Sequence, residues 1–163
     1  MNTLWDYFWP LLAMGLIVGT AASTLGYRRG KRLRALLIGS AITIAATIAW
    51  HSYASRPLVA SVERMTRQAL VYYEMTQIDA RLQRGPLTRD LLLSGKADDW
   101  QRGELARVLS QVPGVGTARW ARNPMGIPMI AEAVLVALAG FSMGLLLAYL
   151  IEIRRRNNAE WRW

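Results

Sequence analysis

Three stretches of this chain are almost free of charge, and a charge-rich block separates the second from the third. They run from Leu4 to Tyr27, from Ala35 to Tyr53 and from Ile127 to Ile151. A helix needs about 20 mostly apolar residues to cross the hydrocarbon core of a bilayer, and each stretch reaches or approaches that length. The pattern predicts three transmembrane helices, because a chain of 163 residues has no soluble core able to cover three such helices.

The block between the second and third stretches has the patterns of a small water-soluble α+β domain. After Ser55, apolar residues recur at three- and four-residue steps, which predicts a helix. Its buried side would hold Val59, Val62, Met65, Ala69 and Tyr72 or Tyr73. Residues 76–83 alternate between polar and apolar, and residues 88–95 contain an apolar run. We expect these two segments to be antiparallel strands joined by the Gly-Pro turn within residues 84–87.

A second amphipathic helix follows the strands. Asp98 or Asp99 is expected to cap it. Its apolar stripe repeats at helical spacing and consists of Leu105, Val108, Leu109 and Val112. The sequence Val-Pro-Gly-Val-Gly then ends the helix, and residues 115–120 read as a third strand. The predicted architecture is therefore an α-helical integral membrane protein of three spans with an αββαβ extracytoplasmic domain.

The positive charges predict how the chain is oriented. The net charge is +9, and five of the cations lie in the loop at residues 28–34, while Arg154, Arg155 and Arg156 follow the last apolar stretch. Lys and Arg collect in cytoplasmic segments next to membrane spans. We therefore expect the N-terminus and the domain to lie outside. Because both clusters adjoin apolar spans, the charge indicates topology and not nucleic-acid binding.

The expected organisation divides the chain into six parts. They are a first span at 1–27 with an outer N-terminus that has no cleavable signal pattern, a cytoplasmic loop at 28–34, a second span at 35–53, an outer domain at 54–126, a third span at 127–152 and a basic cytoplasmic tail at 153–163.

Two short motifs of the outer domain carry a family resemblance. Leu93-Ser94-Gly95 closes a predicted strand, and Val112-Pro113-Gly114-Val115 precedes the last one. With the αββαβ order, these motifs make residues 58–122 resemble the BON family of bacterial envelope domains. The resemblance implies a bacterial inner-membrane protein with a periplasmic binding module linked to envelope or phospholipid contacts, and it carries over no catalytic residues. It also assigns Gly95, Pro113 and Gly114 a structural role.

The residues that carry catalytic or metal chemistry are sparse. The chain has no cysteine and a single histidine, His51, which follows Trp50 at the outer end of the second span. We expect His51 to be solvated or hydrogen-bonded at the membrane interface, and ligation of a haem-type metal is the alternative. Glu132 is the acidic residue inside the third span. An intramembrane carboxylate is a functional candidate. The alternatives are a shallow hydrogen bond to a neighbouring helix, a contact between subunits and proton transfer. We expect no metal site, no cofactor and no enzymatic activity.

Small residues four positions apart predict close helix packing. Such strips let the backbone of a second helix approach. The strips are Gly15, Gly19 and Ser23 in the first span, Gly39 and Thr43 in the second, and Gly140, Gly144 and Ala148 in the third. At least one strip is expected to contact another polypeptide, and packing of the three spans against one another is the alternative.

The outer surface and the tail offer further contact residues. Arg81, Arg84 and Arg119 are candidates for contact with phospholipid headgroups or an acidic partner, and Trp161 and Trp163 for interfacial anchoring or docking. We expect an accessory subunit of an inner-membrane complex, of which respiratory and photosynthetic complexes are examples, or a homo-oligomer. A stand-alone protein that recognises phospholipid or another envelope component, and a transporter or enzyme that uses Glu132, are the alternatives.

Overall fold

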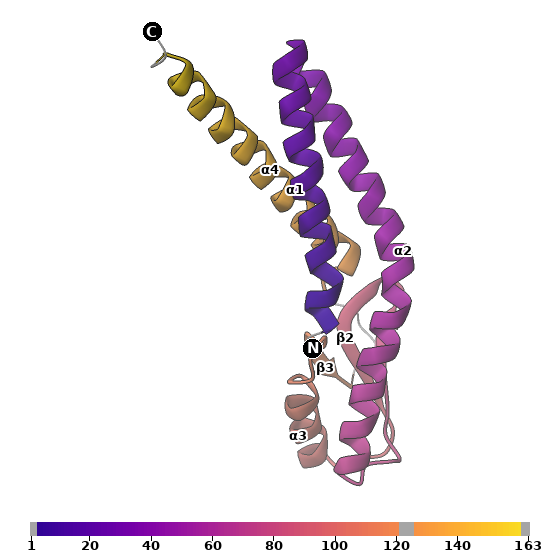
Figure 1. Cartoon of the computed structure of the whole chain (residues 1–163). Helices are drawn as coiled ribbons and strands as arrows, with labels where there is room; N and C mark the ends of the chain where they lie inside the picture. The colour runs from indigo at the N-terminus through magenta and orange to yellow at the C-terminus, as the bar shows by residue number, and fades with distance from the viewer. Residues whose placement is uncertain (1–2, 121–125, 161–163) are drawn as a thin grey trace. The chain divides into compact units, whose positions relative to one another are not determined.

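The computed structural model describes residues 3–120 and 126–160, and within these the side chains of residues 27–29, 159 and 160 are left aside. Figure 1 shows the elements in chain order. They are α1 (Thr3–Arg29), α2 (Arg32–Tyr72), β1 (Asp79–Arg84), β2 (Leu87–Ser94), α3 (Asp99–Leu109), β3 (Thr117–Arg119) and α4 (Met129–Glu160). By length and composition, α1, α2 and α4 are able to cross a membrane. The predicted combination of three apolar helices with a small sheet is confirmed.

The chain forms two compact units, which we describe separately. One, called the lobe below, contains residues 52–132 together with 3–7. The other, called the bundle, contains residues 8–51 and the part of α4 after Glu132. The predicted outer domain at 54–126 falls within the lobe.

Helix α2 differs from the sequence prediction because its 41 residues form one helix, where two helices meeting near Ser55 were expected. Pro57 lies inside it. Proline has no N–H to donate and disfavours a helix interior, yet the helix continues through this residue. The interior of the lobe instead receives one stripe from α2 at four-residue steps, made of Leu58, Val62, Thr66 and Leu70.

Tyr72 and Tyr73 correct a second expectation, because they lie outside the core. Their exposed fractions are 82% and 46%. The stripe ends at Leu70, whose carbonyl accepts the N–H of Met75 at 2.9 Å as the chain leaves the helix. Glu74 adopts a positive φ of 57° in this turn, and both tyrosines come after the last buried residue of the stripe.

The sheet has the order β1-β2-β3. Strands β1 and β2 pair antiparallel through the predicted turn, with Ala80 opposite Leu93 and Leu82 opposite Leu91, and a bulge interrupts the register between Leu82 and Arg84. Strand β3 pairs parallel with β2 and places Ala118 beside Leu91. Side chains alternate between the faces of a sheet, so these apolar residues share the face that enters the core.

Helix α3 covers the core as its apolar stripe predicts, with Leu105 and Leu109 buried. Asp98 caps it in a reciprocal arrangement: the Asp98 carboxylate accepts the N–H of Gln101 at 2.7 Å, and the Gln101 side chain accepts the N–H of Asp98 at 3.2 Å. Such a cap stabilises a helix by about 1 kcal/mol. Leu105 and Leu109 join Val62, Leu70, Leu82 and Leu91 in one buried cluster of the lobe.

Candidate functional site

Four large side chains lie exposed at the end of the lobe where α2 finishes and α3 begins. We call them the tip surface; they are Val71 (58% exposed), Tyr72, Tyr73 and Trp100 (77% exposed). The rings of Tyr72 and Tyr73 meet edge to face with their centroids 5.3 Å apart. Tyrosine and tryptophan supply large contact areas at low entropic cost, which is why they are enriched in protein interfaces.

The sheet register explains why α2 ends where α3 begins. Helix α2 leads through a short turn into the start of β1, and Asp79 at that start pairs with Ser94 at the end of β2. Ser94 leads through Gly95 to the cap at Asp98. The sequence prediction missed this surface, because helical spacing assigned Tyr72 or Tyr73 to the core. A hydropathy pattern does not distinguish an exposed aromatic residue from a buried one.

An ion pair stabilises α3. Glu104 accepts a hydrogen bond from Arg107 Nε at 3.1 Å and contacts its Nη2 as well. The hydrogen bond from Arg107 lowers the pKa of Glu104 below its ordinary value. Asp99 adds negative charge in the first turn of the helix and pairs with Arg102 at 3.7 Å. Glu104 and Asp99 therefore act in surface ion pairs of α3, whereas Asp98 acts in its cap.

Glu132 pairs with a residue of the lobe. It lies in the first turn of α4, and its Oε2 is 3.5 Å from Nη1 of Arg89 on β2. The side chains are 26% and 34% exposed, respectively. An arginine of the sheet is therefore one partner of this carboxylate, beside any hydrogen bond from a neighbouring helix. A carboxylate at a helix N-terminus is also favoured by the helix dipole.

A second polar contact lies beside this pair. Asp90 is 4% exposed, and its Oδ1 accepts the hydroxyl hydrogen of Thr117 at 2.6 Å. A Cβ on Gly126 would lie 2.9 Å from the Asp90 carboxylate, so the chain before α4 passes close to it. Arg89 and Asp90 thus connect β2 both to β3 and to the start of α4. The sequence prediction missed both residues, because they occupy a strand that reads as apolar.

The arginines proposed for lipid or partner contact have partners inside the lobe. Arg81 Nε lies 2.8 Å from Asp79 Oδ2. Arg84 Nη2 is 3.0 Å from both carboxylate oxygens of Glu63. Arg119 Nε donates to the Thr117 hydroxyl at 3.2 Å. These contacts reduce the positive charge that the first two arginines offer to a lipid headgroup.

The glycine strips of α1 and α4 face each other within the bundle. A Cβ on Gly15 would lie 2.1 Å from the carbonyl oxygen of Ala137, and one on Gly140 would lie 2.2 Å from that of Leu12. Gly19 and Gly144 approach the opposite backbone as closely. Both strips therefore pack inside the chain, which was the alternative to an external contact. The expectation of a partner polypeptide must rest on another surface.

The remaining strip residues also lie inside the bundle. A Cβ on Gly39 would lie 2.8 Å from Ala22 Cβ, and Thr43 and Ala148 are buried. Thr43 donates its hydroxyl hydrogen to the Gly39 carbonyl at 2.9 Å, so no polar group of this side chain is left unsatisfied in the apolar surroundings. Ser23 is partly buried and lines a groove described below.

The structural glycines of the lobe have the predicted backbone conformation. Gly95 has a φ of 137° and Gly114 a φ of 103°. A Cβ on Gly114 would also lie 2.5 Å from Val62 Cγ2, so the residue is constrained in two ways. Pro113, between α3 and β3, is exposed.

His51, the residue proposed for haem-type ligation, is a partly buried residue of α2. Within residues 3–120 and 126–160, no group of three His, Cys, Asp or Glu side chains is arranged to hold a metal ion. Trp161 and Trp163 lie outside the described residues.

Comparison of the chain with the profiles of known protein families finds no match, and comparisons with characterised proteins and with solved structures find none either. The resemblance to BON domains therefore stays a prediction.

Proposed function

We propose that this chain is a non-catalytic accessory subunit of a bacterial inner-membrane complex, and that its lobe binds another envelope protein through the tip surface. The observation that carries the proposal is the exposure of Val71, Tyr72, Tyr73 and Trp100 at one end of the lobe. An exposed aromatic and aliphatic group of this kind marks an interaction site in a soluble domain.

The length of α2 favours a protein partner over the membrane. Tyr53 is exposed and ends the second predicted span, where aromatic residues are expected to lie at the outer membrane surface. Tyr72 follows it by 19 residues in the same helix, which corresponds to about 28 Å along the helix axis. An aromatic side chain at that distance from Tyr53 lies too far from the membrane surface to insert into it. A protein partner in the periplasm therefore fits the tip surface better than the membrane does.

The two alternatives have less support. Recognition of phospholipid by the lobe would use Arg81 and Arg84, but Asp79 and Glu63 already pair with them. Transport through Glu132 would require this carboxylate to exchange protons deep in the membrane, whereas it lies in the first turn of α4 beside Arg89. Loss of a measured flux in Glu132→Gln, with folding intact, would favour transport.

Site-specific photocrosslinking in the intact bacterial membrane tests the proposal. A photoreactive phenylalanine analogue at Tyr72 should give one discrete adduct with another envelope protein. The same analogue at Ala60, which is exposed on the same helix, is the matched control and should give none. Trp100→Ala should weaken the Tyr72 adduct at least fivefold.

Three outcomes contradict the proposal. They are equal labelling at Tyr72 and Ala60, no adduct at Tyr72, and an adduct with lipid only. An adduct that consists of two copies of this chain would replace the accessory subunit with a homo-oligomer that uses the same surface.

A further inference from the structure

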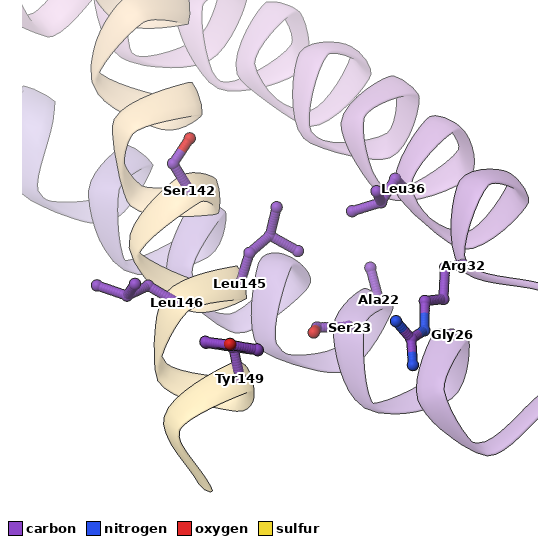
Figure 2. A pocket seen from close by; sticks show the side chains of 9 residues that line it. All are labelled: Ala22, Ser23, Gly26, Arg32, Leu36, Ser142, Leu145, Leu146 and Tyr149. Carbon is purple, nitrogen blue, oxygen red and sulfur yellow. The ribbon is translucent and has the colours of Figure 1, made fainter. Parts of the chain in front are cut away.

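A groove opens in the bundle between α1, the start of α2 and the second half of α4 (Figure 2). Its volume is about 380 Å³, which is at the lower end of the range of roughly 300–1,000 Å³ for sites that hold small molecules. Ala22, Leu36 and Leu145 supply apolar walls from three helices, and Arg32, Ser23 and Tyr149 supply polar groups.

The groove exists because α1 changes its neighbour along its length. At Gly19 the backbone of α1 packs on α4, where a Cβ would lie 2.2 Å from the Phe141 carbonyl oxygen. At Gly26 the nearest atoms belong to α2, with Arg32 Cα and Ala35 Cβ both 3.3 Å from the position of a Cβ. Helices that cross through small residues diverge on either side of the crossing. The space left beside α4 is the groove.

The polar groups of the groove suit an anionic headgroup. Arg32 lines it, and the neighbouring residues Lys31 and Arg34 line a second apolar groove of about 330 Å³ between α1 and α2. In Figure 2, Ser23 of α1 lies between Arg32 of α2 and Tyr149 of α4, so two hydroxyl groups and one guanidinium group line the same groove.

We propose that this groove binds one anionic phospholipid of the surrounding bilayer, with an acyl chain against Leu36 and Leu145 and its phosphate at Arg32. An apolar cleft between helices that lie in a bilayer is filled by the nearest hydrocarbon, because an empty cleft forfeits dispersion contacts. Basic pockets between transmembrane helices bind anionic headgroups by the same combination of charge and apolar wall. Free phosphate would use Arg32 alone and would leave the apolar wall uncovered.

Native mass spectrometry of the full chain tests this assignment. The protein is delipidated in detergent, incubated with equal amounts of phosphatidylglycerol and phosphatidylcholine of identical acyl chains, and analysed for retained lipid. The wild type should keep one phosphatidylglycerol in preference to phosphatidylcholine. Arg32→Gln should weaken phosphatidylglycerol retention about fivefold, because one cation near an anionic lipid contributes about that factor.

Two further variants separate the groove from general lipid contact. Ser23→Leu places a larger side chain in the groove and should abolish the preference for phosphatidylglycerol. Thr24→Leu makes a comparable change at the next residue, which is exposed and absent from the lining, and should leave the preference unchanged. Thermal unfolding in detergent verifies that each variant is folded.

Specific outcomes would overturn the proposal. Equal retention of the two lipids by the wild type, or wild-type retention by both Arg32→Gln and Ser23→Leu, would show that the groove has no anionic lipid. If Ser23→Leu does not fold, the retention of phosphatidylglycerol by Arg32→Gln alone decides whether the groove binds this lipid. Retention of inorganic phosphate in place of lipid, or of a second copy of the chain, would assign the groove to another occupant. None of these results depends on the partner proposed for the lobe.

Discussion

Glu132 in the first turn of α4 lies 3.5 Å from Arg89 on β2, so an ion pair joins the sheet of the lobe to the beginning of the last helix. Both side chains are partly exposed, which limits the strength of the pair, because water screens such charges. The same stretch of β2 contributes Asp90 to the contact with Thr117. Arg89 and Asp90 therefore link β2 to α4 and to β3, respectively.

Glu132→Gln and Arg89→Gln should each lower the free energy of unfolding by about 0.5–1 kcal/mol. The double variant should lose less than the sum of the two, since either change alone removes the pair. Thermal unfolding of the purified protein measures the effect. Asp99→Asn is the control and should have little effect, because the Asp99 side chain is fully exposed and lies 3.7 Å from Arg102. Strictly additive losses would mean that the pair contributes nothing.

Gly15→Ala should destabilise the bundle by about 1–3 kcal/mol, because the added methyl group overlaps the Ala137 carbonyl oxygen and the helix backbones have to separate. Ala21→Val adds carbon at an exposed position of the same helix and serves as the control. The yield of monodisperse protein and the midpoint of thermal unfolding in detergent report the difference. Equal behaviour of the two variants would rule out close α1–α4 packing at Gly15.

Replacing two glycines of the lobe with alanine should change the free energy of unfolding in opposite directions. A Cβ on Gly103 meets nothing within 4 Å inside α3, so Gly103→Ala should raise the free energy of unfolding by about 0.5–1 kcal/mol. Gly114→Ala should lower it by at least 1 kcal/mol, because of its positive φ and the nearby Val62 side chain. Chemical denaturation gives both values, and a gain at Gly114 would contradict the described turn.

The hydrogen bond from Arg107 to Glu104 predicts a pH dependence. It lowers the pKa of Glu104 from its ordinary value of 4.5, so the folded state holds this carboxylate charged more readily than the unfolded chain does. The stabilisation is complete above the ordinary value and disappears as the pH falls through the lowered pKa. The midpoint of thermal unfolding should therefore be higher in wild type than in Glu104→Gln at pH 7, and the gap should close in strong acid. When both proteins also carry Arg107→Gln, their unfolding midpoints should be equal at both pH values, because the hydrogen bond is then absent from each.

The absence of cysteine from the sequence permits a direct test of orientation. Lys96→Cys places one thiol on the exposed surface of the lobe, and Lys31→Cys places one in the basic loop. A membrane-impermeant maleimide added to intact spheroplasts should label the first within minutes and the second only after lysis. The opposite pattern would reverse the predicted topology and move the proposed partner to the cytoplasm.

Periodicity predicted the elements of the lobe well because each has a strong local signal. The alternation around Leu82, the stripe through Leu105 and Leu109, and the cap at Asp98 all depend on residues close together in sequence. The break expected at Ser55 was wrong because the change from apolar to charge-rich sequence there does not interrupt the helix. The exposure of Tyr72 and the pairing of Arg89 with Glu132 depend on how distant segments meet, which local patterns do not contain.

The glycine strips illustrate the same limit in the bundle. Their spacing correctly predicted close helix packing, but it does not specify which helix provides the opposing surface. In the structure, Gly15 meets Ala137 and Gly140 meets Leu12. The groove at Arg32 arises from the divergence beyond that contact, which no sequence pattern indicated.

Among the residues that the structure describes, β1 and β3 are the outer strands of the sheet in the lobe, and each is shaped in a way that discourages aggregation. Strand β3 has only three residues, too few to template a long intermolecular ladder. Strand β1 has a bulge after Leu82 and carries the charged side chains of Arg81 and Arg84, which oppose the docking of an identical strand. The protein at high concentration should accordingly resist conversion into fibrils.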